Sequence, residues 1–146
     1  MTRGTFYLIG HHHYYRSCEF NGDMYPDGHG RLAKELLDRV ETTQDFFKMV
    51  AYFNDTNHKY SDEYPLVYVK DRNDLNTDFN DEYFEHWFSD WVFIKNISDS
   101  PLTFTYRPSE GQTEKETVEV KKGGLLIVNF GHKPSDEDLK ELGLVR

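Results

Sequence analysis

Segments with strand character lie at both ends of this chain and flank two segments with helical periodicity. The stretch 3–9 carries alternating apolar residues, including Phe6 and Leu8, and 14–20 is expected to pair with it as a hairpin. Four further runs rich in β-branched and aromatic residues lie at 91–97, 102–106, 117–120 and 125–130. Because turn-forming breaks separate these runs, they predict an antiparallel meander.

Two amphipathic helices are predicted between the hairpin and the middle of the chain. In the first, at 30–41, apolar residues recur every fourth position, at Leu32, Leu36 and Val40. The second follows an N-cap at Thr42 or Thr43, and its apolar stripe consists of Phe46, Val50 and Phe53. The elements predict an α+β fold, with an antiparallel sheet or sheets, two central helices packed on one face and a short C-terminal helix.

A length of 146 residues fits one globular domain with a core of its own. The short C-terminal helix is expected to begin at an N-cap, Ser135, and to stop at Gly143. The predicted domain, 1–146, has four parts: a hairpin and two helices at 1–54, an acidic aromatic connection at 55–90, antiparallel strands at 91–131 and the short helix at 134–143.

Most of the negative charge lies in 55–90, which we call the acidic segment. It holds ten acidic residues against three basic ones, and so accounts for −7 of the formal net charge of −9. Large aromatic residues are interleaved with these acids or follow them directly: Tyr60, Tyr64, Tyr68, Phe79, Tyr83, Phe84, Trp87, Phe88 and Trp91. One interpretation is a solvated connection, since runs of charge usually stay in water. The other is an interaction segment, because carboxylates mixed with rigid aromatic side chains suit a basic protein partner.

In the interaction hypothesis the carboxylates stand in for the phosphates of a nucleic acid, and the aromatic side chains are anchors. The residues expected at this contact are Glu63, Tyr64, Asp71, Asp74, Asp78, Asp81, Glu82, Tyr83, Glu85 and Trp87. Direct binding to nucleic acid is disfavoured, because phosphate contacts require a basic patch and this chain is acidic. Ten tyrosines also favour a self-interface, so a homo-oligomer is a further expectation.

Composition predicts a cytoplasmic protein. Cys18 is the only cysteine, which excludes an internal disulfide framework and a zinc site built on paired thiolates. No apolar run approaches the ~18 residues of a membrane-spanning helix, and the N-terminus lacks the layout of a signal peptide. Neither a membrane partner nor a resident cofactor is therefore expected, although a divalent metal stays open as an alternative.

A glycine-rich loop before the first helix is the leading candidate for a ligand or metal site. Asp23, Asp27 and His29 offer oxygen and imidazole ligands, and Gly28 and Gly30 bring backbone N–H groups to a helix N-terminus, where anions are stabilised. The alternative is an ordinary turn that Asp27 caps. The Gly-x-Gly sequence also lacks the lysine and the hydroxyl of a P-loop.

The same loop carries a resemblance. Two motifs, Thr2-Arg3-Gly4 and the residues Asn21, Asp23, Tyr25-Pro26, Gly28 and Gly30, resemble those of a group of small uncharacterised proteins from bacteriophage and bacterial genomes. Members of that group open with a Thr-Arg-Gly strand, carry an Asn-x-Asp-x-Tyr-Pro-x-Gly-x-Gly loop and have a later Trp-led strand, to which the strand at Trp91 is similar. The resemblance covers the first forty residues and that strand. It implies a mobile-element setting, where small acidic proteins often act by occupying host defence machinery.

Three further patterns are weaker. Removal of the initiator methionine would expose Thr2, and an N-terminal threonine can act as a nucleophile with its own amine as base. The histidines at 11–13 can ligate a transition metal, but adjacent strand positions point to opposite faces, so an exposed turn is favoured. Phe79 replaces the glycine of an EF-hand calcium loop, although oxygen side chains follow the spacing of such a loop at Asp74, Asn76, Asp78, Glu82 and Glu85.

Two functional hypotheses follow. The first is a non-enzymatic interaction or inhibitor protein of phage or mobile-element type, whose acidic segment binds a basic surface of a host defence protein that handles nucleic acid. The alternative is a small enzyme or a ligand- or metal-binding domain centred on Asp23–Gly30, with Thr2 as the nucleophile in a hydrolase version. The first is favoured because the charge excess is confined to one segment rich in aromatic residues.

Overall fold

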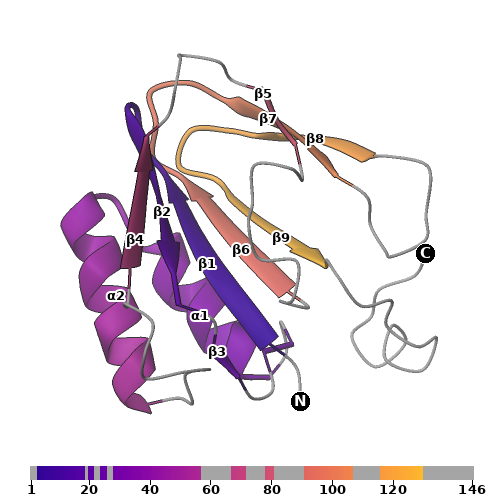
Figure 1. Cartoon of the computed structure of the whole chain (residues 1–146). Coiled ribbons are helices and arrows are strands. Elements are labelled where there is room, and N and C mark those ends of the chain that lie inside the picture. Colours follow the sequence, from indigo (N-terminus) through magenta and orange to yellow (C-terminus); the bar gives the residue numbers. More distant parts are fainter. Residues whose placement is uncertain are drawn as a thin grey trace.

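The fold is that of a computed structural model, whose described residues are 3–18, 20–21, 24–25, 28–56, 67–71, 78–80, 91–106 and 116–129. Within them the elements follow the order β1 (Arg3–Ile9), β2 (His13–Ser17), β3 (Phe20–Asn21), α1 (His29–Asp38), α2 (Thr43–Thr56), β4 (Val67–Asp71), β5 (Asp78–Asn80), β6 (Trp91–Asn96), β7 (Leu102–Tyr106), β8 (Glu116–Val120) and β9 (Leu125–Asn129). Figure 1 shows their arrangement. The predicted α+β class is confirmed.

Among the described residues, the strands form two sheets, of which the larger has six strands and is mixed, with β1 at its centre. Its order is β4-β2-β1-β6-β9, and β3 also pairs with β1. The N-terminal hairpin is antiparallel, with Tyr7 opposite Arg16, whereas β1 and β6 are parallel, with Gly4 opposite Trp91. The expectation of purely antiparallel pairing therefore fails at the centre of the sheet. Parallel neighbours need a long crossover, which the two helices and the acidic segment supply here.

The strand that pairs with β1 in the hairpin contains one extra residue. Arg16 pairs with Tyr7, and Phe20 pairs with Gly4. Three residues lie between Arg16 and Phe20, whereas only two lie between Gly4 and Tyr7. Such a bulge disturbs the ladder of backbone hydrogen bonds. The buried Ser17 hydroxyl compensates: it accepts a hydrogen bond of 2.9 Å from the Phe6 N–H and donates one of 2.8 Å to the Cys18 carbonyl.

The strands after residue 90 form two nested hairpins, and the predicted meander is wrong. β6 pairs with β9, placing Phe93 opposite Ile127, and β7 pairs with β8, placing Phe104 opposite Val118. The inner hairpin leaves the six-stranded sheet and forms a three-stranded sheet with β5, in the order β5-β7-β8. The apolar runs predict where strands lie, but their partners depend on contacts made elsewhere in the fold.

The two faces of the six-stranded sheet carry separate hydrophobic clusters. The helix-side core joins alternate residues of β1 and β6 to side chains of both helices, and its members include Phe6, Leu8, Leu37, Phe46, Phe53 and Phe93. The inter-sheet core joins the residues of β1 and β6 that point to the opposite face, and one residue of β9, to β7. Its buried members are Tyr7, Ile9, Val92, Ile94, Leu102, Phe104 and Val128. Figure 1 shows the helices and the three-stranded sheet on different sides of the larger sheet. Because β1 and β6 are buried on both faces, each contains a run of four consecutive apolar residues, Phe6–Ile9 in β1 and Trp91–Ile94 in β6.

Local capping explains where α2 begins. The Asp45 N–H donates a hydrogen bond of 3.1 Å to the Thr42 hydroxyl, so the predicted N-cap at Thr42 is confirmed. The Asp45 carboxylate in turn accepts hydrogen bonds of 3.1 Å from the backbone N–H groups of Glu41 and Thr42. The bond from the Glu41 N–H is the main reason why the pKa of Asp45 lies below its ordinary value.

A buried lysine anchors the end of α1 to the sheet. Lys95 of β6 is 3% exposed, and its ammonium donates a hydrogen bond of 2.9 Å to the carbonyl of Asp38, the last residue of the helix. A cation is favourable there because the carbonyls at a helix C-terminus carry partial negative charge.

Asn96 connects the two sheets where β6 ends. Its fully buried side-chain amide donates to the carbonyls of Ser100 and Val120, at 3.0 Å each, and its oxygen accepts from the N–H and hydroxyl of Ser98. Its backbone N–H donates to Gly124, and its carbonyl accepts from Gly123, which has a φ of 78°. One side chain thus holds together the start of the β6–β7 connection and the β8–β9 turn.

Outside the acidic segment, the described helices and strands lie close to their predicted positions, and β1 and β7 have the predicted bounds; β5 was not predicted. The predicted helix at 134–143 lies outside the described residues. In the part of the chain that the structure describes, no helix is both long and apolar enough to span a membrane.

Replacing Asn96 should destabilise the fold far more than replacing its exposed neighbour. Asn96→Ala leaves buried backbone groups without partners, so the free energy of unfolding should fall by at least about 2 kcal/mol. Asp99→Ala, in the exposed turn that follows, is the control and should change it by less than about 0.5 kcal/mol. Urea unfolding followed by circular dichroism measures both; equal stability of the two variants would contradict this role of Asn96.

Candidate functional site

The acidic segment contributes an edge strand to each sheet. Among the described strands, β4 is the last on one side of the six-stranded sheet, and β5 is the last on one side of the three-stranded sheet (Figure 1). Asp71 ends β4 and Asp78 begins β5, so two of the residues expected to contact a partner lie at sheet edges. An edge position suits charged residues, because one side of the strand faces away from the sheet.

Along β4 the side chains alternate between the two faces of the sheet. Val67 packs against the helix-side core. Val69, on the same face, is 55% exposed, and the side chain of Asp71 is 84% exposed. An exposed apolar residue is therefore followed, two positions along the same face, by an exposed carboxylate.

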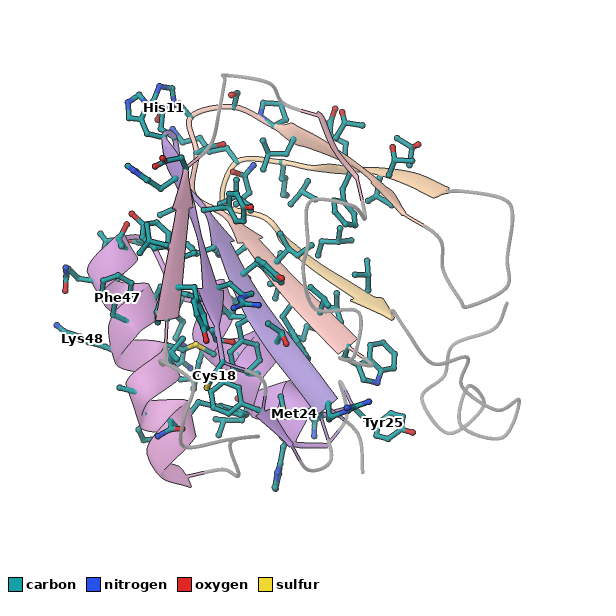
Figure 2. The ribbon with its side chains drawn as sticks, in the orientation of Figure 1. His11, Cys18, Met24, Tyr25, Phe47 and Lys48 are labelled. Atoms are coloured by element: carbon teal, nitrogen blue, oxygen red, sulfur yellow. The ribbon has the colours of Figure 1, made fainter. Side chains whose placement is uncertain are left out.

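The hairpin histidines lie beside two carboxylates. His13 Nε2 is 3.2 Å from an oxygen of Asp71, which faces it across β2 and β4, and His11 Nδ1 is 3.9 Å from an oxygen of Asp99. His11 and His12 are exposed, as expected for a turn, and Figure 2 shows His11 at the hairpin tip. His11 and His13 are directed to different carboxylates. Among the described residues, no group of three or more histidine, cysteine, aspartate or glutamate side chains is arranged to hold a metal ion.

A buried arginine lies next to β4 on the opposite face. Arg16 of β2 is 7% exposed, and its guanidinium lies 4.0 Å from the centre of the Tyr68 ring, which faces it on β4. Arg16 Nε has no hydrogen-bond partner within the described ranges. The attraction between a cation and an aromatic face therefore helps to hold β4 against β2.

On the helix-side face, aromatic side chains extend from β4 toward α2. Tyr15 of β2 faces Val69, and its ring meets that of Phe47 edge to face, with centroids 5.7 Å apart. Figure 2 shows Phe47 and Lys48 on the outer side of α2. We call the surface formed on the helix-side face by His13, Tyr15, Val69 and Asp71 the β4 edge.

The glycine-rich loop packs against the sheet. Met24 is fully buried, and a Cβ added to Gly4 would lie 3.0 Å from its side chain. A Cβ on Gly30 would lie 2.5 Å from the carbonyl oxygens of both Met24 and Tyr25, closer than real Cβ atoms come. The Tyr25 ring in turn meets Trp91, with centroids 6.0 Å apart, and Figure 2 shows Met24 and Tyr25 near the start of β1. Glycines from both motifs of the resemblance therefore serve the packing of this loop.

The described part of the loop has the geometry of a turn. The Gly28 N–H donates a hydrogen bond of 2.8 Å to the Tyr25 carbonyl, and His29 is an exposed residue at the start of α1. Asp23 and Asp27 lie outside the described residues, as does Thr2. A ligand or metal at this loop, and a nucleophilic threonine, therefore remain predictions.

Most residues expected at a partner contact also lie outside the described ranges: Glu63, Tyr64, Asp74, Asp81, Glu82, Tyr83, Glu85 and Trp87. Of the EF-hand-like pattern, the structure describes only the backbone of Asp78–Asn80, which forms β5 and pairs in parallel with β7. Calcium binding likewise remains a prediction.

No sequence pattern predicted that His13, Tyr15 and Arg16 are the neighbours of Asp71, Val69 and Tyr68. Each pair follows from the register between β2 and β4, which lie on opposite sides of two helices in the chain. The only signal for it is that each of the two strands alternates side chains between faces.

Comparison of the chain with protein-family models, with curated proteins and with solved structures finds no match. Its function is therefore inferred from its own charges, contacts and exposed surfaces. The position of β4 and β5, the two described strands of the acidic segment, at the ends of the described sheets is the main such property.

Replacing Gly30 should reveal whether this glycine serves packing. In a helix, Gly→Ala normally stabilises by roughly 0.5–1 kcal/mol, but here the new methyl group meets two carbonyl oxygens, so Gly30→Ala should destabilise by at least about 1 kcal/mol. Lys34→Ala, at an exposed position of the same helix, is the control and should be close to neutral. Thermal and urea unfolding provide the measurement, and a more stable Gly30→Ala variant would rule out the packing role.

Proposed function

We propose that this chain is a non-enzymatic interaction protein that inhibits a basic, nucleic-acid-handling host protein by occupying its nucleic-acid-binding surface. The observation that carries the proposal is that both described strands of the acidic segment, β4 and β5, are edge strands. Edge strands are the positions from which a segment can meet another protein without leaving its own sheet.

The distribution of charge supports a basic partner. The acidic segment carries −7, and the rest of the chain carries only −2. A concentrated field of one sign speeds association with a surface of the opposite sign, and aromatic side chains among the carboxylates provide anchors that charge alone does not. Asp71 agrees with this picture because its carboxylate is exposed.

The setting proposed for this activity is the cytoplasm of a cell that carries a phage or another mobile element. The resemblance of Thr2-Arg3-Gly4 and of the loop motif to small phage and bacterial proteins supports this setting. A defence protein that binds nucleic acid offers the basic surface that an acidic inhibitor needs.

The proposal predicts capture of a basic partner that depends on the acidic segment and on salt. The immobilised chain is incubated with a nuclease-treated bacterial extract, and elution is followed as NaCl rises from about 50 mM to about 500 mM. One variant, D71N/D74N/D78N, removes three negative charges from the acidic segment. The control, E35Q/D38N/E41Q, removes three charges at exposed positions of α1 and the residues after it.

We expect wild type and control to retain the same basic protein at low salt and to release it at high salt. When the captured protein and the chain are each purified and mixed, the chain should block the binding of that protein to labelled DNA or RNA. The D71N/D74N/D78N variant should retain it poorly. Retention that persists at high salt, or that is equal in both triple variants, would contradict the proposal. Failure to block nucleic-acid binding would contradict inhibition.

A further inference from the structure

The outer side of β4 is an unpaired sheet edge within the described part of the chain. β4 pairs with β2 on its inner side, and no other described strand pairs with it. The N–H and C=O groups on the outer side of such a strand form a template for one more strand. Strand addition to an exposed edge is a common way for a protein to bind an extended peptide.

The side chains of β4 determine what an added strand would meet. On the helix-side face it would lie beside Val69, which is 55% exposed, and beside Asp71, whose side chain is 84% exposed. Residues directly opposite each other on neighbouring strands are close enough for apolar pairs and for pairs of opposite charge to stabilise the sheet. The matching strand therefore has an apolar residue and, two positions away, a basic one.

On the other face of β4, Tyr68 is already in contact with β2. The Tyr68 ring lies against the buried Arg16 guanidinium, 4.0 Å from it. This contact holds β4 in register with β2 before any partner arrives, and a preformed edge lowers the entropy cost of binding. Val69 and Asp71 are the exposed side chains described on β4, and they lie together on the helix-side face.

We propose that the β4 edge binds an extended basic segment of the partner by strand addition. A β-branched residue of that segment packs on Val69, and a lysine or arginine two positions away pairs with Asp71. This inference rests on the proposed function and adds to it the place and the chemistry of recognition. Charge complementarity favours a basic partner over a second copy of this chain, because β4 in each copy would bring the same acidic segment to the contact.

The probe is the peptide acetyl-Thr-Lys-Thr-Val-Thr-Lys-Thr-amide. With its valine opposite Val69, it offers a lysine to Asp71 whether the added strand runs parallel or antiparallel to β4. A second peptide has glutamates in place of both lysines, and a third contains the residues of the first in an order that breaks the alternation. Fluorescence anisotropy of labelled peptides measures their affinities at low salt.

We expect wild type to prefer the lysine peptide over both others. Asp71→Lys should lower affinity for the lysine peptide about fivefold and raise affinity for the glutamate peptide by a similar factor, because attraction and repulsion exchange places. Val69→Thr should weaken the binding of the lysine peptide and of the glutamate peptide. Glu35→Lys on α1 has the same change in charge at a distant exposed position, and should alter each affinity less than twofold. Melting curves check that each variant is folded.

The proposal is overturned if Asp71→Lys fails to reverse the preference, if the peptide with broken alternation binds as well as the lysine peptide, or if no peptide binds. A concentration-dependent dimer that the lysine peptide does not dissociate would show that a second copy occupies the edge, and would also overturn it. These results are distinguishable from failure of the proposed function. A captured basic protein that Asp71→Lys retains normally would leave that function intact and exclude only the β4 edge as its site.

Discussion

The parallel pair formed by β1 and β6 is the constraint on which the rest of the fold depends. Gly4 to Ile9 and Trp91 to Asn96 are all buried, so this pair must be covered on both faces. The helices supply one cover through the helix-side core, and the three-stranded sheet supplies the other through the inter-sheet core. Asn96 holds the second cover in place, because its amide satisfies backbone groups on the way into β7 and at the end of β8.

This constraint also determines where the negative charge can lie. A carboxylate on β1 or β6 would be buried on either face, at a cost of several kcal/mol unless it were paired. The one charged residue of β6, Lys95, is buried, and its ammonium donates a hydrogen bond to the carbonyl at the end of α1. The described strands of the acidic segment lie instead at the two sheet edges, where Asp71 remains in water. The burial of β1 and β6 thus leaves the sheet edges as the places where exposed carboxylates such as Asp71 can lie.

The sequence predicted elements better than it predicted contacts. The strand at Arg3–Ile9, the helix capped by Thr42 and the strand at Leu102–Tyr106 follow from local periodicity and capping, which need only neighbouring residues. The parallel pairing of β1 with β6 and the nested hairpins depend on which segments bury each other, and local patterns do not encode that choice.

The candidate site shows the same division. Asp71 was expected at a partner contact from the pattern of charge and aromatic residues, and Gly28 and Gly30 were expected to bring backbone N–H groups to a helix N-terminus as part of a ligand site. The contact of Gly30 with the Met24 and Tyr25 carbonyls depends on the path of the loop before α1. The pairs His13–Asp71 and Tyr15–Val69 depend on the register between β2 and β4. Of the histidines at 11–13, His13 faces Asp71 through that register, whereas His11 lies near Asp99 and its ring contacts that of His12.

Hydrogen exchange of backbone amides, measured by NMR with and without the lysine peptide, tests the central claim that the acidic segment offers an open edge on a rigid scaffold. Amides of β1 and β6 should exchange slowest, whereas every second amide of β4 should exchange fast in the free chain and slow down when the peptide is added. A β4 strand as protected as β1 in the free chain, or one whose exchange the peptide leaves unchanged, would contradict the account.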